Sequence, residues 1–226
     1  MRTVVFDLDG TLADTSGDLI AAANACFVAR GHAPLLDAQD DALIAFQGGR
    51  AMLRVGYARV GLEGAALEAL VEADYKPLLG YYGAEIDRYT RLYPGAVDAV
   101  KTLRNQGFAT SICTNKPEGL ARDLVARLGV AELFDALIGA DTLPVRKPAP
   151  EPYIAAVEQA GGTVARSLLL GDTVTDRETA RVVGVPSVLV SFGPEGRGIE
   201  RLAPEALLDR YEDLPALALR LLGAAD

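Results

Sequence analysis

Short apolar runs alternate with longer segments of helical composition along most of this 226-residue chain. Runs rich in β-branched and other apolar residues predict buried strands, and these runs occupy residues 3–8, 108–114, 136–139, 167–171 and 187–190. Helices are predicted between them, at residues 95–106, 117–128, 150–160 and 176–183, and again at the C-terminal end. Alternating strands and helices imply parallel βαβ units. The pattern therefore predicts an α/β fold with a Rossmann-like parallel sheet flanked by helices.

Residues 14–90 break this alternation, because no convincing strand occurs in them. Helices are predicted there at residues 17–31, 37–46, 49–60 and 64–76, the first closed by Gly31 and the last broken by Pro77. The first strand must rejoin the later ones across this stretch. We therefore predict an α/β domain of residues 1–13 and 91–226, interrupted by an all-helical domain of residues 14–90.

Composition narrows the classes of protein to which the chain can belong. Half of its residues are apolar, which allows a sizeable core, and its net charge of −9 argues against nucleic-acid and anionic-membrane partners. No apolar run approaches the roughly 18 residues of a membrane span, and Met1 and Arg2 lead into the first strand without a signal-peptide pattern. Cys26 and Cys113 lie among apolar neighbours and are predicted to be reduced core residues. We expect a cytoplasmic protein, either a monomer or a homodimer.

The first strand ends in two acidic residues, Asp7 and Asp9. Because they lie two positions apart, their carboxylates project to the same side of an extended chain. Gly10 then turns the chain and brings backbone N–H groups toward the same place. Two carboxylates at the carboxyl end of a strand form a hard-oxygen site suited to Mg²⁺, and one of them can act as a nucleophile.

Three later strands are followed by polar residues of a complementary kind. Thr114 and Asn115 follow the second strand, Lys147 lies in the loop after the third, and Asp172 and Asp176 follow the fourth. Each has an ordinary structural interpretation, since such residues also cap helices, form turns or face solvent. Their joint occurrence at the carboxyl ends of strands indicates an active site instead.

These residue types suit the hydrolysis of a phosphate monoester. The reaction needs a positioned nucleophile and neutralisation of charge, which a carboxylate and Mg²⁺ supply. The Thr114 hydroxyl, backbone N–H groups near Gly10 and Asn115, and the Lys147 ammonium are expected to bind the phosphoryl oxygens. The second aspartate of the first motif can move protons to the leaving group and from water.

The four motifs, residues 7–11, 111–115, Lys147 and 171–176, resemble in kind and order those of haloacid-dehalogenase-superfamily phosphatases. The resemblance implies a helical cap at residues 14–90, which closes over the site and selects the substrate. The implied roles are nucleophile for Asp7, general acid and base for Asp9, phosphate binding for Thr114 and Lys147, metal binding for Asp7, Asp9 and Asp172, and support for Asp176.

Three stretches, at residues 47–49, 114–117 and 185–188, are similar to those of phosphoglycolate phosphatases, so the expected substrate is a small phosphorylated metabolite. Gly48 and Gly49 could open a helix whose N–H groups read a substrate anion, and Arg50 could pair with a carboxylate. Alternatively, the glycines only separate two helices and Arg50 is solvated.

Other reactions of the superfamily remain open or are disfavoured. A phosphotransferase or phosphomutase, or a phosphatase for a sugar phosphate, nucleotide or pyrophosphate, is the main alternative. Asp9 argues against dehalogenation, because the dehalogenases lack an aspartate at this position. A phosphonate-cleaving enzyme would need a cap lysine, and residues 14–90 offer only Lys76.

Overall fold

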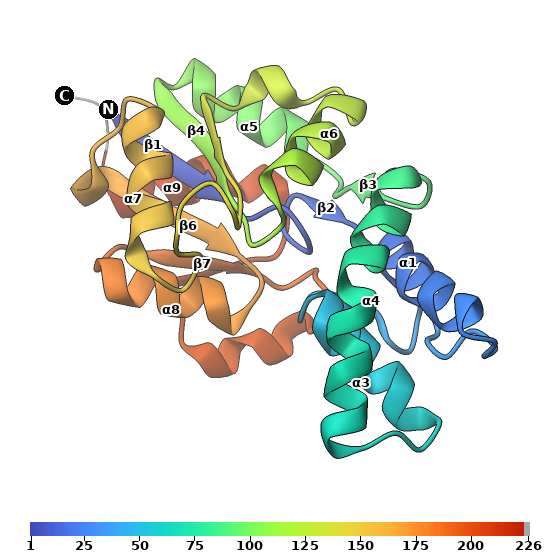
Figure 1. The fold of residues 1–226 in the computed structure, drawn as a ribbon. Helices are drawn as coiled ribbons and strands as arrows, with labels where there is room; N and C mark the ends of the chain where they lie inside the picture. The colour runs from blue at the N-terminus through green and yellow to red at the C-terminus, as the bar shows by residue number, and fades with distance from the viewer. Residues whose placement is uncertain (224–226) are drawn as a thin grey trace. The chain divides into compact units, whose positions relative to one another are not determined.

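The apolar runs form one parallel sheet of six strands. The computed structural model describes residues 1–223. In chain order the strands of this sheet are β1 (Arg2–Phe6), β4 (Phe108–Cys113), β5 (Ala136–Ile138), β6 (Ser167–Gly171), β7 (Ser187–Val190) and β8 (Ala206–Leu208). Their spatial order is β5-β4-β1-β6-β7-β8, so the first strand lies in the interior of the sheet (Figure 1). The predicted α/β fold with a parallel sheet is confirmed.

The register of the sheet brings three strand ends together. Phe6 of β1 pairs with Ile112 of β4 on one side and with Leu170 of β6 on the other. The Asp7 N–H continues this pairing by donating to the Leu170 carbonyl at 2.8 Å. Residues that immediately follow these strands therefore meet at one edge of the sheet, where ligands of open α/β sheets bind.

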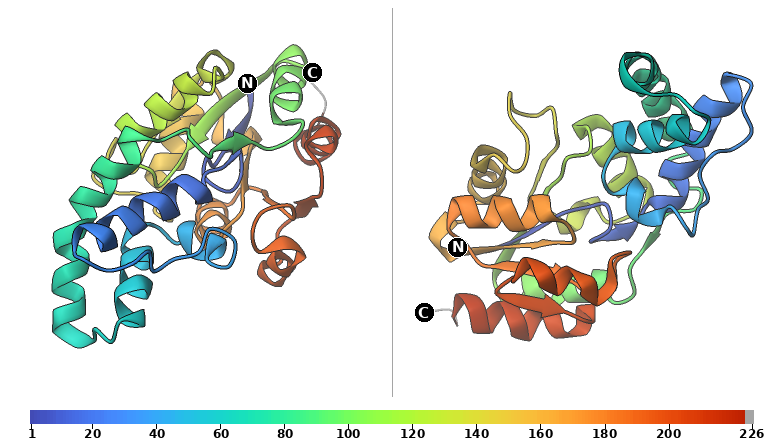
Figure 2. Two further views of the ribbon diagram at one scale, coloured as in Figure 1. Left: turned by 90° about the vertical axis from the view of Figure 1, so that its right-hand side faces the viewer. Right: turned by 90° about the horizontal axis from the view of Figure 1, so that it is seen from below.

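Helices cover both faces of the sheet. They are α5 (Ala96–Asn105), α6 (Glu118–Arg127), α7 (Pro150–Gln159), α8 (Val174–Val183) and α9 (Leu214–Leu222), joined by the short 3₁₀ helices η1 (Ala131–Leu133), η2 (Val164–Arg166), η3 (Gly196–Leu202) and η4 (Tyr211–Asp213). On one face of the sheet α7 and α8 pack together, and on the other face α5 packs against α9 (Figure 1 and Figure 2). Tyr153 of α7 and Ala180 of α8 are buried in one cluster with Val5 and Leu169 of the sheet. Among the described residues, no helix is long and apolar enough to cross a membrane.

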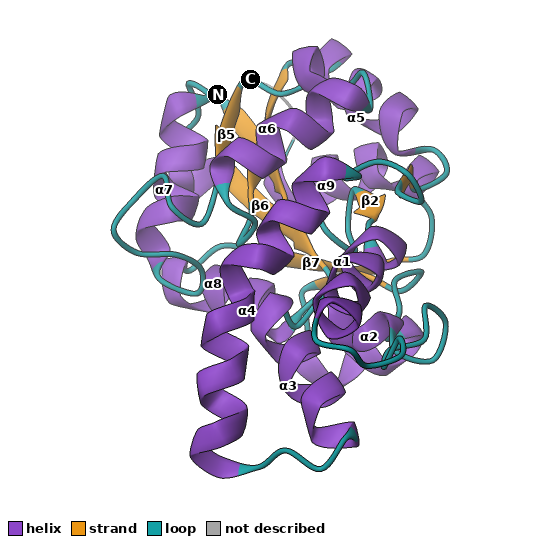
Figure 3. Ribbon diagram, turned by 45° about the vertical axis from the view of Figure 1, so that its right-hand side comes forward, coloured by secondary structure: helices purple, strands orange, loops and turns teal. Residues whose placement is uncertain are grey.

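Thr15–Arg91 form a second compact unit, while Met1–Asp14 and the chain from Leu92 onward form the first. Where the chain leaves and rejoins the first unit, β2 (Ala13–Asp14) pairs with β3 (Arg91–Leu92). The helices of the second unit, shown in purple with the others in Figure 3, are α1 (Ser16–Ala29), α2 (Ala42–Ala45), α3 (Gly49–Arg59) and α4 (Gly64–Ala84).

The second unit has its own tightly packed core. Gly56 lets α3 approach α1, because a Cβ at this position would lie 2.1 Å from the Phe27 ring. Phe27 packs edge-on against Tyr57, with the ring centroids 5.0 Å apart. The buried carboxylate of Asp74 accepts hydrogen bonds from the Tyr57 hydroxyl and from the Arg30 guanidinium, the latter at 2.6 Å. Aromatic packing and a buried polar network thus link α1, α3 and α4.

The predicted end of a helix at Pro77 is wrong, because α4 continues through this residue to Ala84. A proline inside a helix costs about 3 kcal/mol. Leu78 and Tyr82 follow it on the same helix and are almost completely buried, and each such side chain contributes roughly 1.5–3 kcal/mol. Burial of these two side chains is therefore large enough to offset the local cost.

One further local prediction is wrong, and one strand of the sheet was not predicted. The helix expected at residues 37–46 shortens to Ala42–Ala45, because the Asp37 carboxylate accepts the backbone N–H groups of Gln39 and Asp40 and holds a turn. The helix predicted at the C-terminal end is present as α9, but the strand β8 that precedes it was not predicted. This edge strand forms through pairing of Leu207 with Leu189 of β7, a contact that local sequence does not reveal.

Candidate active site

Asp7 lies at the end of β1, almost entirely buried, with 8% of its surface exposed. One of its carboxylate oxygens, Oδ1, accepts the N–H of Leu8 at 2.7 Å, which fixes the side chain at the sheet edge. The chain then turns at Gly10, whose φ is +78°. A Cβ on Gly10 would lie 2.2 Å from Oδ2 of Asp172, so only glycine fits both this backbone conformation and this contact. The turn thereby brings the loop after β1 against the loop after β6.

The Gly10 N–H has a partner within its own loop. It donates to the Ala13 carbonyl at 2.9 Å. The N–H of Gly10 is therefore already engaged, and phosphate binding by this loop would use neighbouring N–H groups. That role stays a prediction.

The loop after β6 begins α8 with a capping box. Thr173 is the N-cap, and its hydroxyl accepts the Asp176 N–H while the Asp176 side chain accepts the Thr173 N–H. Oδ2 of Asp176 also accepts the Thr173 hydroxyl at 2.6 Å. Asp172, just before the cap, accepts the Thr11 hydroxyl at 2.8 Å on Oδ1. Both carboxylates of this motif are thus held in fixed orientations.

Lys147 connects these two loops through its ammonium group. Its Nζ lies 2.7 Å from Oδ1 of Asp176 and 3.2 Å from Oδ1 of Asp7, and the residue is only 3% exposed. Burial acts to lower the pKa of Lys147, but the carboxylates of Asp176 and Asp7 outweigh it and hold this pKa above its ordinary value. Lys147 is therefore a permanent positive charge among the site's carboxylates.

The second motif contributes to the same site from the end of β4. The Thr114 N–H donates to the Ile138 carbonyl at 2.9 Å, and its buried hydroxyl accepts the Lys116 N–H at 3.2 Å. The Asn115 side chain donates to the Lys147 carbonyl at 3.0 Å and so ties the second motif to the lysine loop. The phosphate-binding roles of Thr114 and Asn115 stay predictions.

Three buried carboxylates, those of Asp7, Asp172 and Asp176, each offer an oxygen within 4.8 Å of the others. Burial raises the pKa of Asp7 to about 7; the Lys147 charge opposes this rise, and the Asp176 and Asp9 charges add to it. Burial, followed by the charges of Asp176 and Asp7, also raises the pKa of Asp172 well above its ordinary value. Buried oxygen donors with excess negative charge fit a hard divalent cation such as Mg²⁺. Both Asp176 oxygens already bind Lys147 or the start of α8. Metal binding by Asp7 and Asp172 stays a prediction.

Asp9 is not one of the three carboxylates that lie within 4.8 Å of one another, although its charge acts on Asp7. Its two oxygens lie 2.7 and 2.9 Å from Nζ of Lys116, a residue that is 6% exposed. The prediction that Asp9 is a metal ligand stays a prediction, while its carboxylate has a clear partner elsewhere in the site.

Sequence reasoning assigned no role to two residues that the structure brings to the site. Lys116 lies in the family-like stretch of residues 114–117 and is one of only four lysines in an arginine-rich chain. The Tyr211 hydroxyl donates to the Thr11 carbonyl at 2.7 Å. It thereby holds Thr11, whose own hydroxyl donates to Asp172. No local signal identifies Tyr211, because its partner is far away in the chain.

The residues predicted to read the substrate from the helical unit lie at the start of α3. Gly48, with φ of +96°, is the N-cap residue, and a Cβ on Gly49 would lie 3.1 Å from Leu78 and 3.2 Å from Tyr75. The Arg50 guanidinium makes two hydrogen bonds to Glu72, at 2.6 and 2.9 Å, and stacks over the Tyr75 ring at 3.6 Å. The contact between Arg50 and substrate stays a prediction. To bind a substrate carboxylate, the Arg50 guanidinium would have to leave Glu72 and Tyr75 or bind the substrate in addition to them.

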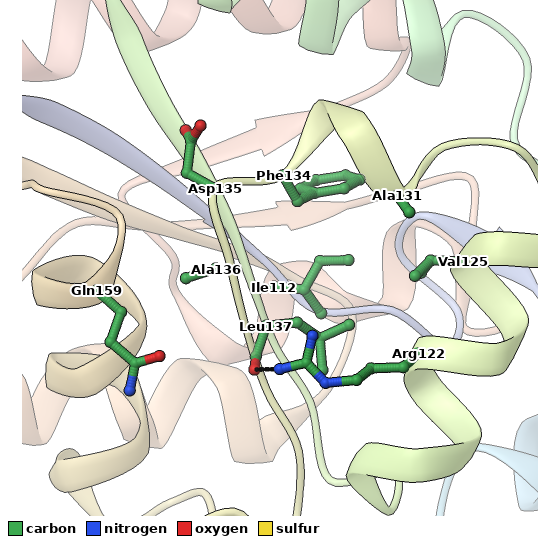
Figure 4. Close-up of a pocket in the computed structure, with 9 residues that line it drawn as sticks. All are labelled: Ile112, Arg122, Val125, Ala131, Phe134, Asp135, Ala136, Leu137 and Gln159. Atoms are coloured by element: carbon green, nitrogen blue, oxygen red, sulfur yellow. Dashed lines mark hydrogen bonds between the residues drawn. The ribbon is translucent and has the colours of Figure 1, made fainter.

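A surface hollow elsewhere in the first unit is chemically unlike this site. Figure 4 shows it beside β5, where Arg122 donates to the Leu137 carbonyl at 3.3 Å. It is lined by Ile112, Arg122, Val125, Ala131, Phe134, Asp135, Ala136, Leu137 and Gln159. None of the predicted site residues belongs to it.

Comparison with known proteins places this chain in a family. The family model described as haloacid dehalogenase-like hydrolase matches residues 1–184, which include the four motifs. The chain belongs to this family. The acidic and basic side chains gathered at the carboxyl ends of β1, β4 and β6 therefore form the candidate active site of this hydrolase.

Relatives within the hydrolase family cover almost the whole chain. The phosphoglycolate phosphatase of Caulobacter vibrioides is 36% identical over 97% of this chain and 92% of that protein. The phosphoglycolate phosphatase of Agrobacterium fabrum is 37% identical over 98% of this chain and 95% of that protein. A crystal structure from Lactobacillus delbrueckii subsp. bulgaricus, of a candidate phosphoglycolate phosphatase, has a TM-score of 0.81 at 26% identity and covers 99% of this chain and all of that one.

Proposed function

We propose that this hydrolase is a Mg²⁺-dependent phosphomonoesterase that acts on a small phosphorylated metabolite through an aspartyl-phosphate, with phosphoglycolate as the first substrate to test. The single observation that carries the proposal is the position of Asp7, buried at a strand end with Oδ1 3.2 Å from the Lys147 ammonium and within reach of Asp172. The names of the relatives, which cover the chain almost completely, support the choice of substrate.

The proposed roles follow from the contacts of each side chain. Asp7 and Asp172 would hold Mg²⁺, which when bound offsets the negative charge of the carboxylates and of the phosphate. Lys147 would neutralise the phosphoryl oxygens, and Thr114 at the end of β4 would donate its hydroxyl to them. Asp176 keeps Lys147 in place through its 2.7 Å contact.

The proposed reaction has two steps. A carboxylate oxygen of Asp7 forms a bond to phosphorus while the ester P–O bond breaks, and Asp9 gives a proton to the leaving alkoxide. Water then attacks the same phosphorus, Asp9 accepts a proton from it, and the Asp7 carboxylate and inorganic phosphate are released. Asp9 suits this proton transfer because its carboxylate lies outside the three-carboxylate group and is partly exposed, at 19% of its side chain.

The test is release of inorganic phosphate from a panel of esters, with Mg²⁺ and with EDTA. The panel contains 2-phosphoglycolate, glucose 6-phosphate, a nucleoside monophosphate and pyrophosphate. Wild-type protein is compared with Asp7→Asn and with Asp98→Asn, a matched change at an exposed position of α5. We expect Mg²⁺-dependent release by the wild type and Asp98→Asn, and none by Asp7→Asn.

Mass spectrometry of acid-quenched wild-type protein should also find a phosphoryl group on the peptide that contains Asp7. Near-normal turnover by Asp7→Asn would contradict its assignment as nucleophile. Phosphate transfer that requires an added sugar acceptor would instead identify a phosphotransferase or mutase.

A further inference from the structure

Two buried lysines divide the carboxylates of the site between them. Lys147 is bound to Asp7 and Asp176, on the side of the proposed nucleophile and metal. Lys116 is bound to Asp9, with Nζ 2.7 and 2.9 Å from the two carboxylate oxygens and only 3% of its side chain exposed. The second ammonium therefore accompanies the residue that would face the leaving group.

The position of Lys116 sets which part of a substrate it can reach. In the proposed reaction the ester oxygen hydrogen-bonds to Asp9, at about 3 Å or less. Since the Lys116 ammonium is also within hydrogen-bond distance of Asp9, the ester oxygen and Nζ can be no more than about 6 Å apart. A carboxylate joined to the ester oxygen through one carbon atom can therefore bring one of its oxygens within hydrogen-bond distance of Nζ.

We propose that Lys116 binds a carboxylate on the leaving group and so selects phosphate esters of small hydroxy acids, an inference that rests on the proposed phosphatase function. The three N–H groups of an ammonium allow it to bind Asp9 and a second anion together. Lys116 is on the core unit itself, so this selection does not depend on the helical unit.

The charges of the site support the same conclusion. When all are ionised, four carboxylates (Asp7, Asp9, Asp172 and Asp176) face two ammonium groups (Lys116 and Lys147), which leaves two negative charges. A divalent cation would offset these, and the substrate then brings further negative charge in two places: on the phosphoryl group, and on the carboxylate at the leaving-group side. Both ammonium groups bind carboxylates of the site, but Lys147 lies beside Asp7, which would hold the phosphoryl group, whereas Lys116 lies beside Asp9, which would face the leaving group. Charge-assisted hydrogen bonds in such a buried setting are strong.

The experiment compares two esters with leaving groups of similar size. One is 2-phosphoglycolate, which carries the carboxylate, and the other is 2-hydroxyethyl phosphate, which has a neutral hydroxyl. The readout is the ratio of kcat/KM for the two esters, measured with Mg²⁺ for the wild type, Lys116→Met and Lys101→Met. Lys101 is an exposed lysine on α5 and serves as the matched control.

We expect the wild type to prefer the carboxylate ester. Lys116→Met should lower turnover of both esters, because Asp9 loses its partner, but should lower the selectivity ratio by about ten- to hundredfold, the usual size of a lost hydrogen bond between charged groups. Lys101→Met should keep the wild-type ratio. Thermal unfolding of each variant checks that it is folded, and Lys116→Gln replaces Lys116→Met if the latter is not.

Each other outcome has a definite meaning. Equal losses for both esters in Lys116→Met would overturn the proposal and leave Lys116 as a positioning residue for Asp9. A wild type with the same kcat/KM for both esters would also overturn the proposal, and that result needs no variant. A ratio lowered by Arg50→Ala but not by Lys116→Met would place carboxylate recognition in the helical unit and also overturn it. A wild type that hydrolyses other esters of the panel but neither of these two would overturn this proposal alone. Failure of the wild type to hydrolyse these two esters and every ester of the panel would instead reject the phosphatase function itself.

Discussion

Replacing Asp7 with asparagine should make the metal-free protein more stable at neutral and alkaline pH. Burial, together with Asp176 and Asp9 and against Lys147, raises the pKa of the Asp7 carboxyl from 3.8 to about 7. Between these two values the folded protein binds the proton and the unfolded chain does not, so the free energy of unfolding falls as the pH rises. At 1.36 kcal/mol per pH unit, the whole difference amounts to about 4 kcal/mol.

The measurable part of this effect lies above the isoelectric point, which is about 4.7. From pH 5.5 to pH 8, the rise through a pKa of about 7 should cost the wild type about 2 kcal/mol. Asp7→Asn removes this contribution, because asparagine can still accept the Leu8 N–H but carries no charge. It also loses the attraction to Lys147, so the gain in stability at pH 8 should be smaller than the full difference.

The assay is urea unfolding in EDTA at several pH values between 5.5 and 8. Wild type, Asp7→Asn and the exposed control Asp98→Asn are compared, and the measured quantity is the change in unfolding free energy across that range. Mg²⁺ should then stabilise the wild type, most strongly at pH 8, and stabilise Asp7→Asn much less. An identical pH dependence in wild type and Asp7→Asn would refute the reasoning, because Asp7 would then titrate alike in the folded and unfolded chains.

Three further predictions concern the supports of the site. Lys147→Met should lower the unfolding free energy by about 3–5 kcal/mol in urea titrations and abolish turnover, because it leaves buried carboxylates without their cation; a loss below about 1 kcal/mol would contradict this. Gly10→Ala should greatly weaken Mg²⁺ binding in isothermal titration calorimetry, since its Cβ would lie 2.2 Å from an Asp172 oxygen at a φ of +78°; unchanged affinity would show that this contact is unimportant. Thr173→Ala should cost about 1 kcal/mol in thermal unfolding through loss of the cap of α8, and should reduce kcat because Asp176 loses an orienting partner; a variant with wild-type stability would argue against the capping box.

The sequence predicts the sheet and the gathering of its polar residues for the same physical reason. Parallel strands buried on both faces must be apolar throughout, so runs such as residues 168–170 identify themselves. The carboxyl ends of neighbouring parallel strands share an edge, so Asp7, Thr114 and Asp172 could be expected to lie near one another. The order β5-β4-β1-β6-β7-β8 could not be predicted in this way, because it depends on pairings between distant segments.

The details that the sequence did not reveal are those decided by tertiary contacts. The pairing of Lys116 with Asp9 and the hydrogen bond from Tyr211 to Thr11 join residues far apart in the chain. No periodicity or capping rule encodes such partners. The same limit explains Pro77, where local propensity predicts the end of a helix and burial of the following turn prevents it.

The ordinary and the functional interpretation of an acidic residue need not exclude each other, as Asp176 shows. Its Oδ2 accepts hydrogen bonds at the start of α8, which is the role of many acidic residues that follow a strand. Its Oδ1 binds the Lys147 ammonium at 2.7 Å, and that ammonium reaches Asp7. The helix start therefore fixes the orientation of the lysine, and the lysine partly offsets the negative charge around the proposed nucleophile. Because one carboxylate serves both purposes, the geometry of the active site and the beginning of α8 are expected to depend on each other.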